Sequence, residues 1–189
     1  VAREGRDPRF SPDGTAIAYW TGKGGRSEIF ARQGGRIFVV PAAGGEPRQL
    51  ASEILFASTP AWSPDGRRLL FVGVPRSATQ RRYTWFLTEV ADDRPVAVNA
   101  ADVLGAPNGQ VPTPSQWRPD NRVLFSARGG QSTNLQQVLL DPVRATLGEP
   151  GRLTFGGSVE DAPSADAAGR VAYADLTWNF DLWSLPVST

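Results

Sequence analysis

"PAWSPDGRRLLFVG", residues 60–73, places a Ser-Pro-Asp-Gly run directly before an apolar stretch. The same order occurs as "PRFSPDGTAIAYW" in residues 8–20 and as "SQWRPDNRVLFSA" in residues 115–127. A degenerate fourth copy, "PSADAAGRVAYA", covers residues 163–174. The copies recur at intervals of about fifty residues, which is typical of propeller blades and longer than most solenoid repeats. The sequence therefore predicts a protein built from four repeated units.

A second motif alternates with the first. "GGEPRQLA", "DDRPVAVNA" and "LGEPGRLTFG" each contain a proline followed three residues later by an aliphatic residue. Apolar, alternating runs lie between the two motifs: "GRIFVVPA", "TWFLTEVA", "NLQQVLLD" and finally "FDLWSLPV". Such runs, bounded by Gly and Pro, are the pattern of strands. Each repeat thus predicts four short strands, and the chain an all-β propeller of four blades, the last incomplete, over about 6–52, 58–101, 113–156 and 161–189.

Composition agrees with short elements and excludes several kinds of chemistry. Twenty Gly and sixteen Pro in 189 residues favour tight turns over long helices. The net charge of +1 gives no reason to expect nucleic acid as a partner. With no Cys and no His, the usual zinc sites and the Ser-His-Asp and Cys-His systems are absent from this chain. We therefore expect no cofactor, no metal and no catalytic residue here, so any catalysis would lie outside this chain.

The repeated turn has a structural interpretation at each position. Proline fixes φ near −65° at the second turn position, aspartate bonds nearby amides, and glycine accepts the positive φ that returns the chain to a strand. A catalytic serine or aspartate would need a partner base, and the chain has no histidine to serve. We therefore assign a structural role to the turn residues: Pro12, Asp13, Gly14, Pro64, Asp65, Gly66, Pro119 and Asp120.

The motifs as they stand resemble the propeller repeat of the TolB family, also called WD-like repeats. "PAWSPDGRRLLFVG" and "GGEPRQLA" match that pattern closely, whereas Arg118 in the third Ser position and the insertion "NAADVLGAPNGQVPTP" at 99–114 depart from it. The ending "DLWSLPV" is similar to propellers carried by bacterial eukaryotic-like serine/threonine kinases and regulators. The outer strand is missing before the first copy and after the last. We therefore expect a segment of a larger propeller, closed by further blades or by a strand-donating partner.

The resemblance implies three functions, in this order. The first is a non-catalytic binding, scaffolding or sensor module that recognises a protein or peptide, in a periplasmic or other extracytoplasmic location in the cell envelope. The second is the substrate-filtering propeller of a prolyl-oligopeptidase-like serine peptidase whose catalytic domain lies elsewhere. The third is a structural array joined through its open edge. No apolar run approaches the roughly 20 residues of a membrane span, so we expect no transmembrane segment.

Two aromatic stretches are candidate partner-binding loops. "TQRRYTWF" combines basic and aromatic residues that can anchor a protein contact, and "LTWNFDLW" is rich in aromatics. In both, packing between blades is the competing interpretation. The loop at 21–28 lacks phosphate-loop spacing, and the acidic pairs at 92–93 and 160–161 match no calcium-loop spacing. The candidate partner residues are Arg81, Arg82, Tyr83, Trp85, Trp178 and Phe180.

Overall fold

The computed structural model describes residues 4–23, 33–79, 82–106, 109–166 and 168–177. Two four-stranded antiparallel sheets come first along the chain, each with its strands in sequence order. The first contains β1 (Gly5–Phe10), β2 (Ala16–Lys23), β3 (Gln33–Pro41) and β4 (Arg48–Leu50). The second contains β5 (Ile54–Trp62), β6 (Arg68–Pro75), β7 (Thr84–Glu89) and β8 (Val96–Val98).

The rest of the chain forms a third and the beginning of a fourth unit. A short helix, α1 (Ala100–Val103), lies in the insertion that precedes the third unit. The third unit has β9, β10 and β11 in order, and its outer position is divided between β12 and β13, which both pair with β11. A single parallel bridge joins β11 to β14, which pairs with β15. The strands are β9 (Pro114–Trp117), β10 (Arg122–Gly129), β11 (Ser132–Asp141), β12 (Thr146–Leu147), β13 (Gly151–Arg152), β14 (Val159–Ala165) and β15 (Val171–Leu176).

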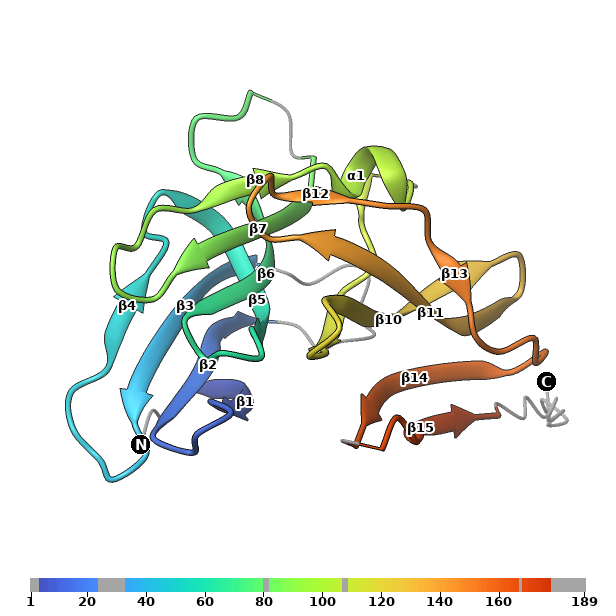
Figure 1. Cartoon of the computed structure of the whole chain (residues 1–189). Helices are drawn as coiled ribbons and strands as arrows, with labels where there is room; N and C mark the ends of the chain where they lie inside the picture. The colour runs from blue at the N-terminus through green and yellow to red at the C-terminus, as the bar shows by residue number, and fades with distance from the viewer. Residues whose placement is uncertain (1–3, 24–32, 80–81, 107–108, 167, 178–189) are drawn as a thin grey trace, which may run out of the picture.

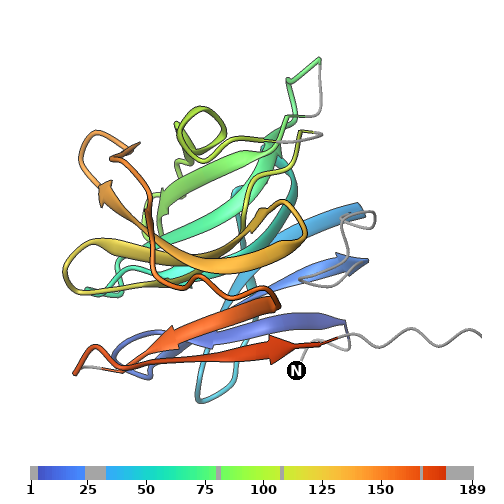
Figure 2. The ribbon, with the colours of Figure 1, turned by 90° about the vertical axis from the view of Figure 1, so that its right-hand side faces the viewer.

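The four units follow one another in an arc (Figure 1). The first strands of the units face the centre: β5 contacts β1 and β9, and β9 in turn contacts β14. The first and fourth units occupy the two ends of the arc, with β1, β14 and β15 at its lower side in both views (Figures 1 and 2). The predicted all-β, partial propeller is thereby confirmed. The expected third strand of the fourth repeat, "FDLWSLPV", lies outside the described residues.

Apolar side chains fill the space between neighbouring sheets. Successive residues of a strand point to opposite faces, and each sheet in the middle of the arc is covered on both faces. One core lies between the first and second units, and includes Ala18, Trp20, Ile37, Leu50, Trp62, Leu69, Phe71 and Phe86. The other lies between the second and third units, and includes Leu70, Val72, Trp85, Val98, Trp117, Val123, Phe125, Val138 and Leu140. Within β6, neighbouring residues therefore belong to different cores.

Proline sets the boundaries of both the outer and the inner strands. Pro47, Pro95 and Pro150 each stand directly before an outer strand, as the second motif predicts. In β1, β5 and β14, the pairing register shifts at a residue of positive φ that precedes a proline. The bulged residues are Asp7, Thr59 and Ala162, with φ of 46°, 54° and 54°. Because proline donates no hydrogen bond, each inner strand leaves the ladder at this point, a feature that the sequence analysis did not anticipate.

The Ser-Pro-Asp-Gly stretches form tight turns that hold themselves together. In the first turn, the Gly14 amide donates to the Ser11 carbonyl over 2.9 Å, and Gly14 has a φ of 73°. The Asp13 carboxylate accepts from the Ser11 hydroxyl at 2.6 Å and from the Thr15 amide at 3.0 Å. The Ser11 hydroxyl oxygen also accepts from the Ala16 amide at 3.0 Å. Serine and aspartate thus satisfy each other and the backbone of the returning strand.

The second turn repeats this geometry, and the third replaces part of it. Gly66 has a φ of 69°, and Asn121 takes the glycine position of the third turn with a φ of 59°. Arg118 stands where the other two turns have serine, and its guanidinium lies 3.7 Å from the Asp120 carboxylate. The same guanidinium lies next to Gly169 of the fourth turn. Arg118 thus keeps an ion pair within the third turn and also lies next to the fourth unit.

Hydrogen bonds within the turns also change the acidity of their aspartates. The Ser11 hydroxyl and the Thr15 amide lower the pKa of Asp13 below its usual 3.8. The Ser63 hydroxyl and the Arg67 amide lower the pKa of Asp65 in the same way. Both carboxylates thus remain ionised in the folded protein at a pH where the unfolded chain already takes up protons.

The left-handed backbone at Gly66 predicts the effect of replacing it. Gly66→Val should lower the free energy of unfolding by about 1–3 kcal/mol, because a β-branched residue resists positive φ. Gly66→Asn should cost clearly less, because Asn121 occupies the same position of the third turn. Urea denaturation followed by tryptophan fluorescence measures both. Equal losses for the two variants would contradict a backbone origin of the effect.

The lowered pKa of the turn aspartates predicts how stability depends on pH. The pKa of Asp13 and Asp65 is lower in the folded protein than in the unfolded chain. Their stabilisation is therefore complete at a pH above the unfolded pKa, and it is lost as the pH falls through the folded pKa. Asp13→Asn combined with Asp65→Asn should therefore flatten the fall in urea midpoint between about pH 5 and pH 2. Asp92→Asn, at an exposed carboxylate outside these turns, is the control. An unchanged slope in the double variant would refute this role.

Candidate functional site

The aromatic residues of the first candidate loop are buried, which corrects their assignment to partner binding. Tyr83 is 7% exposed and Trp85 is 0% exposed, and both belong to the core between the second and third units. The Trp85 indole donates to the Pro112 carbonyl at 2.7 Å and meets the Phe125 ring edge-on at 5.8 Å. Tyr83 directly precedes β7 and Trp85 lies within it, so both pack between two sheets, where aromatic side chains are stabilised by burial. The competing interpretation, packing between blades, describes these two residues.

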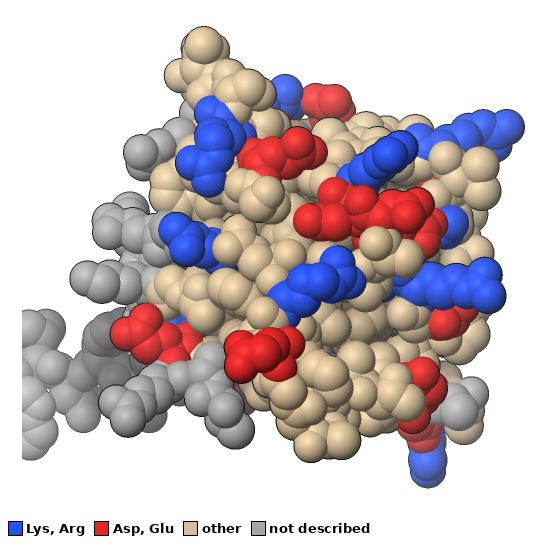
Figure 3. Space-filling model, turned by 90° about the vertical axis from the view of Figure 1, so that its left-hand side faces the viewer, with Lys and Arg blue, Asp and Glu red and all other residues tan. Residues whose placement is uncertain are grey.

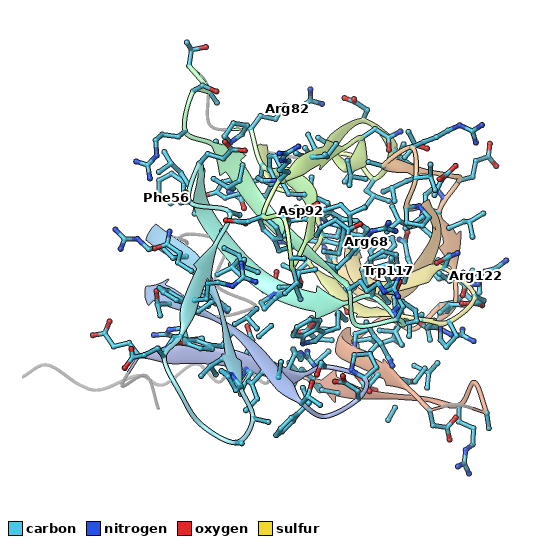
Figure 4. The ribbon with its side chains drawn as sticks, turned by 60° about the vertical axis from the view of Figure 1, so that its left-hand side comes forward. Phe56, Arg68, Arg82, Asp92, Trp117 and Arg122 are labelled. Carbon is cyan, nitrogen blue, oxygen red and sulfur yellow. The ribbon has the colours of Figure 1, made fainter. Side chains whose placement is uncertain are left out.

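The basic part of the same loop points away from the centre of the molecule. Arg82 is exposed and forms an ion pair of 2.7 Å with Asp102 of α1. Figure 4 shows Arg82 at the upper edge, well separated from Trp117 on the inner strands. Arg81, Trp178 and Phe180 lie outside the described residues. The structure therefore does not assemble the predicted loop residues into one site.

The two acidic pairs serve different structural contacts. Glu160 is 4% exposed and accepts from the Asn134 side-chain amide at 3.3 Å and from the Thr154 hydroxyl. The Asp93 carboxylate accepts from the Ala51 amide at 2.6 Å and so links the first and second units. Among the described residues, no group of three potential metal ligands occurs.

Surface charge on one face of the molecule is mixed in sign. Figure 3 shows Lys and Arg interspersed with Asp and Glu over the first and second units. One such pair joins Arg68 to Glu89 at 2.5 Å.

Among the described residues, no helix is long and apolar enough to cross a bilayer.

A hollow of about 340 Å³ lies where the inner strands of all four units converge. It opens between the ends of β1, β5, β9 and β14, next to the repeated turns. Its apolar wall consists of Phe10, Trp62, Trp117, Pro12, Pro64 and Pro119. Its other lining residues include Arg9, Ser115, Gln116 and Ser164. The hollow is a candidate binding site, because it is concave and lined by both apolar and polar groups.

The hollow follows from the repeat itself. In each of the first three copies an aromatic residue stands two positions before the turn proline, and the three pairs meet at the hollow. In the degenerate fourth copy Ala165 takes the aromatic position, and the preceding Ser164 lines the hollow there. The sequence pattern predicts only a turn role for Pro12, Pro64 and Pro119. The recurring aromatic-x-Pro spacing could have indicated that they share a common surface.

Hydrogen bonds fix the walls of the hollow across the boundaries between units. The Trp62 indole donates to the Arg9 carbonyl at 2.8 Å and so ties β5 to β1. The Gln116 side-chain amide donates to the Ala165 carbonyl at 3.0 Å, and its oxygen accepts from the Ala165 amide, which ties β9 to β14. The walls are thus set by the scaffold, which favours binding without large rearrangement.

Comparison with known proteins connects part of the chain to a peptidase. No family model matches the chain. Over 64 residues, the chain is 34% identical to YuxL, an uncharacterized peptidase of Bacillus subtilis (strain 168). The matched segment is 34% of this chain and only 9% of the relative.

Solved structures resemble the chain over most of its length. TolB from Acinetobacter baumannii matches 92% of the chain with a TM-score of 0.59 and 18% identity, and the match covers 38% of TolB. Acylaminoacyl peptidase of Pyrococcus horikoshii matches 89% with a TM-score of 0.54 and 16% identity, over 23% of its own length. The β-propeller domain of the Trilobed protease from Pyrococcus furiosus matches 80% with a TM-score of 0.52 and 16% identity, over 43% of its length. The chain thus spans less than half of each structure.

These likenesses establish the fold and leave the activity open. Identities below 20% over whole sheets reflect shared architecture, and one fold serves many functions. None of these relatives supports the expected link to a kinase. The chain is a partial β-propeller with the TolB-like fold, which TolB shares with the propeller domains of peptidases.

Proposed function

We propose that this chain is the substrate-filtering propeller of a prolyl-oligopeptidase-like serine peptidase. The observation that carries the proposal is the 34% identity to a peptidase over 64 residues, about twice the identity of the structural likenesses. Peptidase propellers also recur among the similar structures. We therefore place this role before the non-catalytic binding module, which the likeness to TolB supports through the fold alone.

The chemistry of the chain fits a filter that works beside a separate catalytic domain. A serine peptidase triad needs a histidine as general base, and this chain has none. Catalysis would therefore be supplied by a part of the protein outside this chain. The propeller would contribute a rigid frame, since its sheets are joined by two continuous apolar cores. Such a frame can exclude folded proteins and admit extended peptides on steric grounds.

Labelling with a fluorophosphonate, which reacts with activated serines, tests the proposal on the complete gene product. The full-length protein should be labelled covalently, and peptides that share one cleavable bond should be hydrolysed more slowly as their length increases. The present chain should remain unlabelled, because it lacks histidine. A full-length protein that is folded, unlabelled and inactive on every peptide would overturn the proposal and favour the binding module.

A further inference from the structure

We propose that Arg118 and Arg122 of the third unit bind a carboxylate of a partner protein. The two residues lie at the third turn and do not belong to the lining of the hollow. The site follows from two departures from the repeat, and it needs no hydrolysis. It therefore goes beyond the proposed role beside a catalytic domain.

The first departure is Arg118, which stands where the first two turns have serine. In those turns the serine hydroxyl donates to the turn aspartate, at 2.6 Å from Ser11 and at 2.5 Å from Ser63. The Arg118 guanidinium has five N–H donors, but it lies 3.7 Å from the Asp120 carboxylate, beyond hydrogen-bond distance. No described residue accepts a hydrogen bond from this guanidinium, although its side chain is only 24% exposed.

The second departure concerns Arg122, the first residue of β10. In the second unit the equivalent Arg68 lies opposite Glu89 in the strand pair, and the two form an ion pair of 2.5 Å. In the third unit Leu139 lies opposite Arg122, so the acidic partner of the repeat is missing. The Arg122 guanidinium lies 3.5 Å from the Asp120 carboxylate instead.

Two guanidinium groups thus share one carboxylate, and the cluster of Arg118, Asp120 and Arg122 carries one positive charge in excess. The exposed Arg144 and Arg170, by contrast, each have an aspartate of their own, at 3.0 and 2.6 Å. A second carboxylate would complete the cluster, because the planar guanidinium fork matches the two oxygens of a carboxylate.

The surroundings of the cluster favour an acidic side chain of a protein over a free anion. Leu139 is 49% exposed, and its side chain lies on the same face of the strand pair as that of Arg122, because opposite residues share a face. An apolar neighbour of the acidic residue can cover Leu139, which gains free energy. Arginine next to apolar surface is also typical of the residues that dominate protein interfaces. The surface thus fits a segment in which glutamate or aspartate stands next to an aliphatic residue.

Fluorescence anisotropy tests the site on the full-length protein, which is first treated with fluorophosphonate so that no hydrolysis disturbs the measurement. The probe is tetramethylrhodamine-labelled Gly-Leu-Glu-Leu-Glu-Gly amide, and its twin has glutamine in place of glutamate. We expect saturable binding of the probe and at least tenfold weaker binding of the twin, which corresponds to the loss of a charge-assisted pair. Added salt should weaken binding of the probe, because the cluster is partly exposed.

Two substitutions restore the repeat and should each remove the site while the fold is kept. Arg118→Ser returns the serine of the first two turns, and Leu139→Glu gives Arg122 the acidic partner that the second unit has. Each should weaken binding of the probe roughly tenfold. Arg144→Ser is the matched control, because it removes the same charge from a side chain that is 80% exposed and already paired with Asp141. This variant should bind the probe like the unmodified protein.

Equal affinity of the unmodified protein and Arg118→Ser, with thermal unfolding showing both to be folded, would overturn the proposal. Equal binding of the probe and its glutamine twin would do the same. Displacement of the probe by inorganic phosphate at a lower concentration than by acetate would also contradict it, and would indicate a phosphate ligand. Because anisotropy reads binding alone, the site can stand even where fluorophosphonate labelling fails.

Discussion

The packing of apolar sheet faces against one another is the interaction on which this structure depends. A four-stranded sheet of this size cannot bury its own side chains, so it must be covered by a neighbour on each apolar face. The alternation of β6 shows this directly, because Leu69 and Phe71 belong to one core while Leu70 and Val72 belong to the other. The edge-on contact of Trp85 with Phe125 connects the second unit to the third in the same way.

The same constraint creates the hollow. Sheets that pack face to face in an arc bring their first strands together at the centre, where space narrows and the strands leave their ladders at bulges before proline. The turns that follow are stabilised by their own serine and aspartate bonds. Their prolines are therefore free to serve as a surface. A stabilising repeat and a candidate binding surface thus come from the same residues.

The boundary between the third and fourth units differs in character from the other two. Described contacts there include Asn134 with Glu160 and Gln116 with Ala165, which are polar, and the reach of Arg118 toward Gly169. Buried hydrogen bonds of this kind depend on correct geometry more than apolar packing does. The unit that lost the turn aromatic contributes the polar Ser164 to the lining of the hollow. The fourth repeat thus lacks the aromatic and the proline that each of the other three repeats contributes to the hollow.

The sequence by itself determined the repeat, the strand order within each unit and the positions of the tight turns. These follow from local rules: alternation of apolar residues, proline before the outer strands, and glycine or asparagine where φ is positive. Tertiary structure alone decided which aromatics are buried. Tyr83 and Trp85 look like a binding loop in the sequence, yet packing between two sheets covers them, whereas Phe10 remains exposed. Burial depends on neighbours distant along the chain, so the hollow emerged only when four separated segments met.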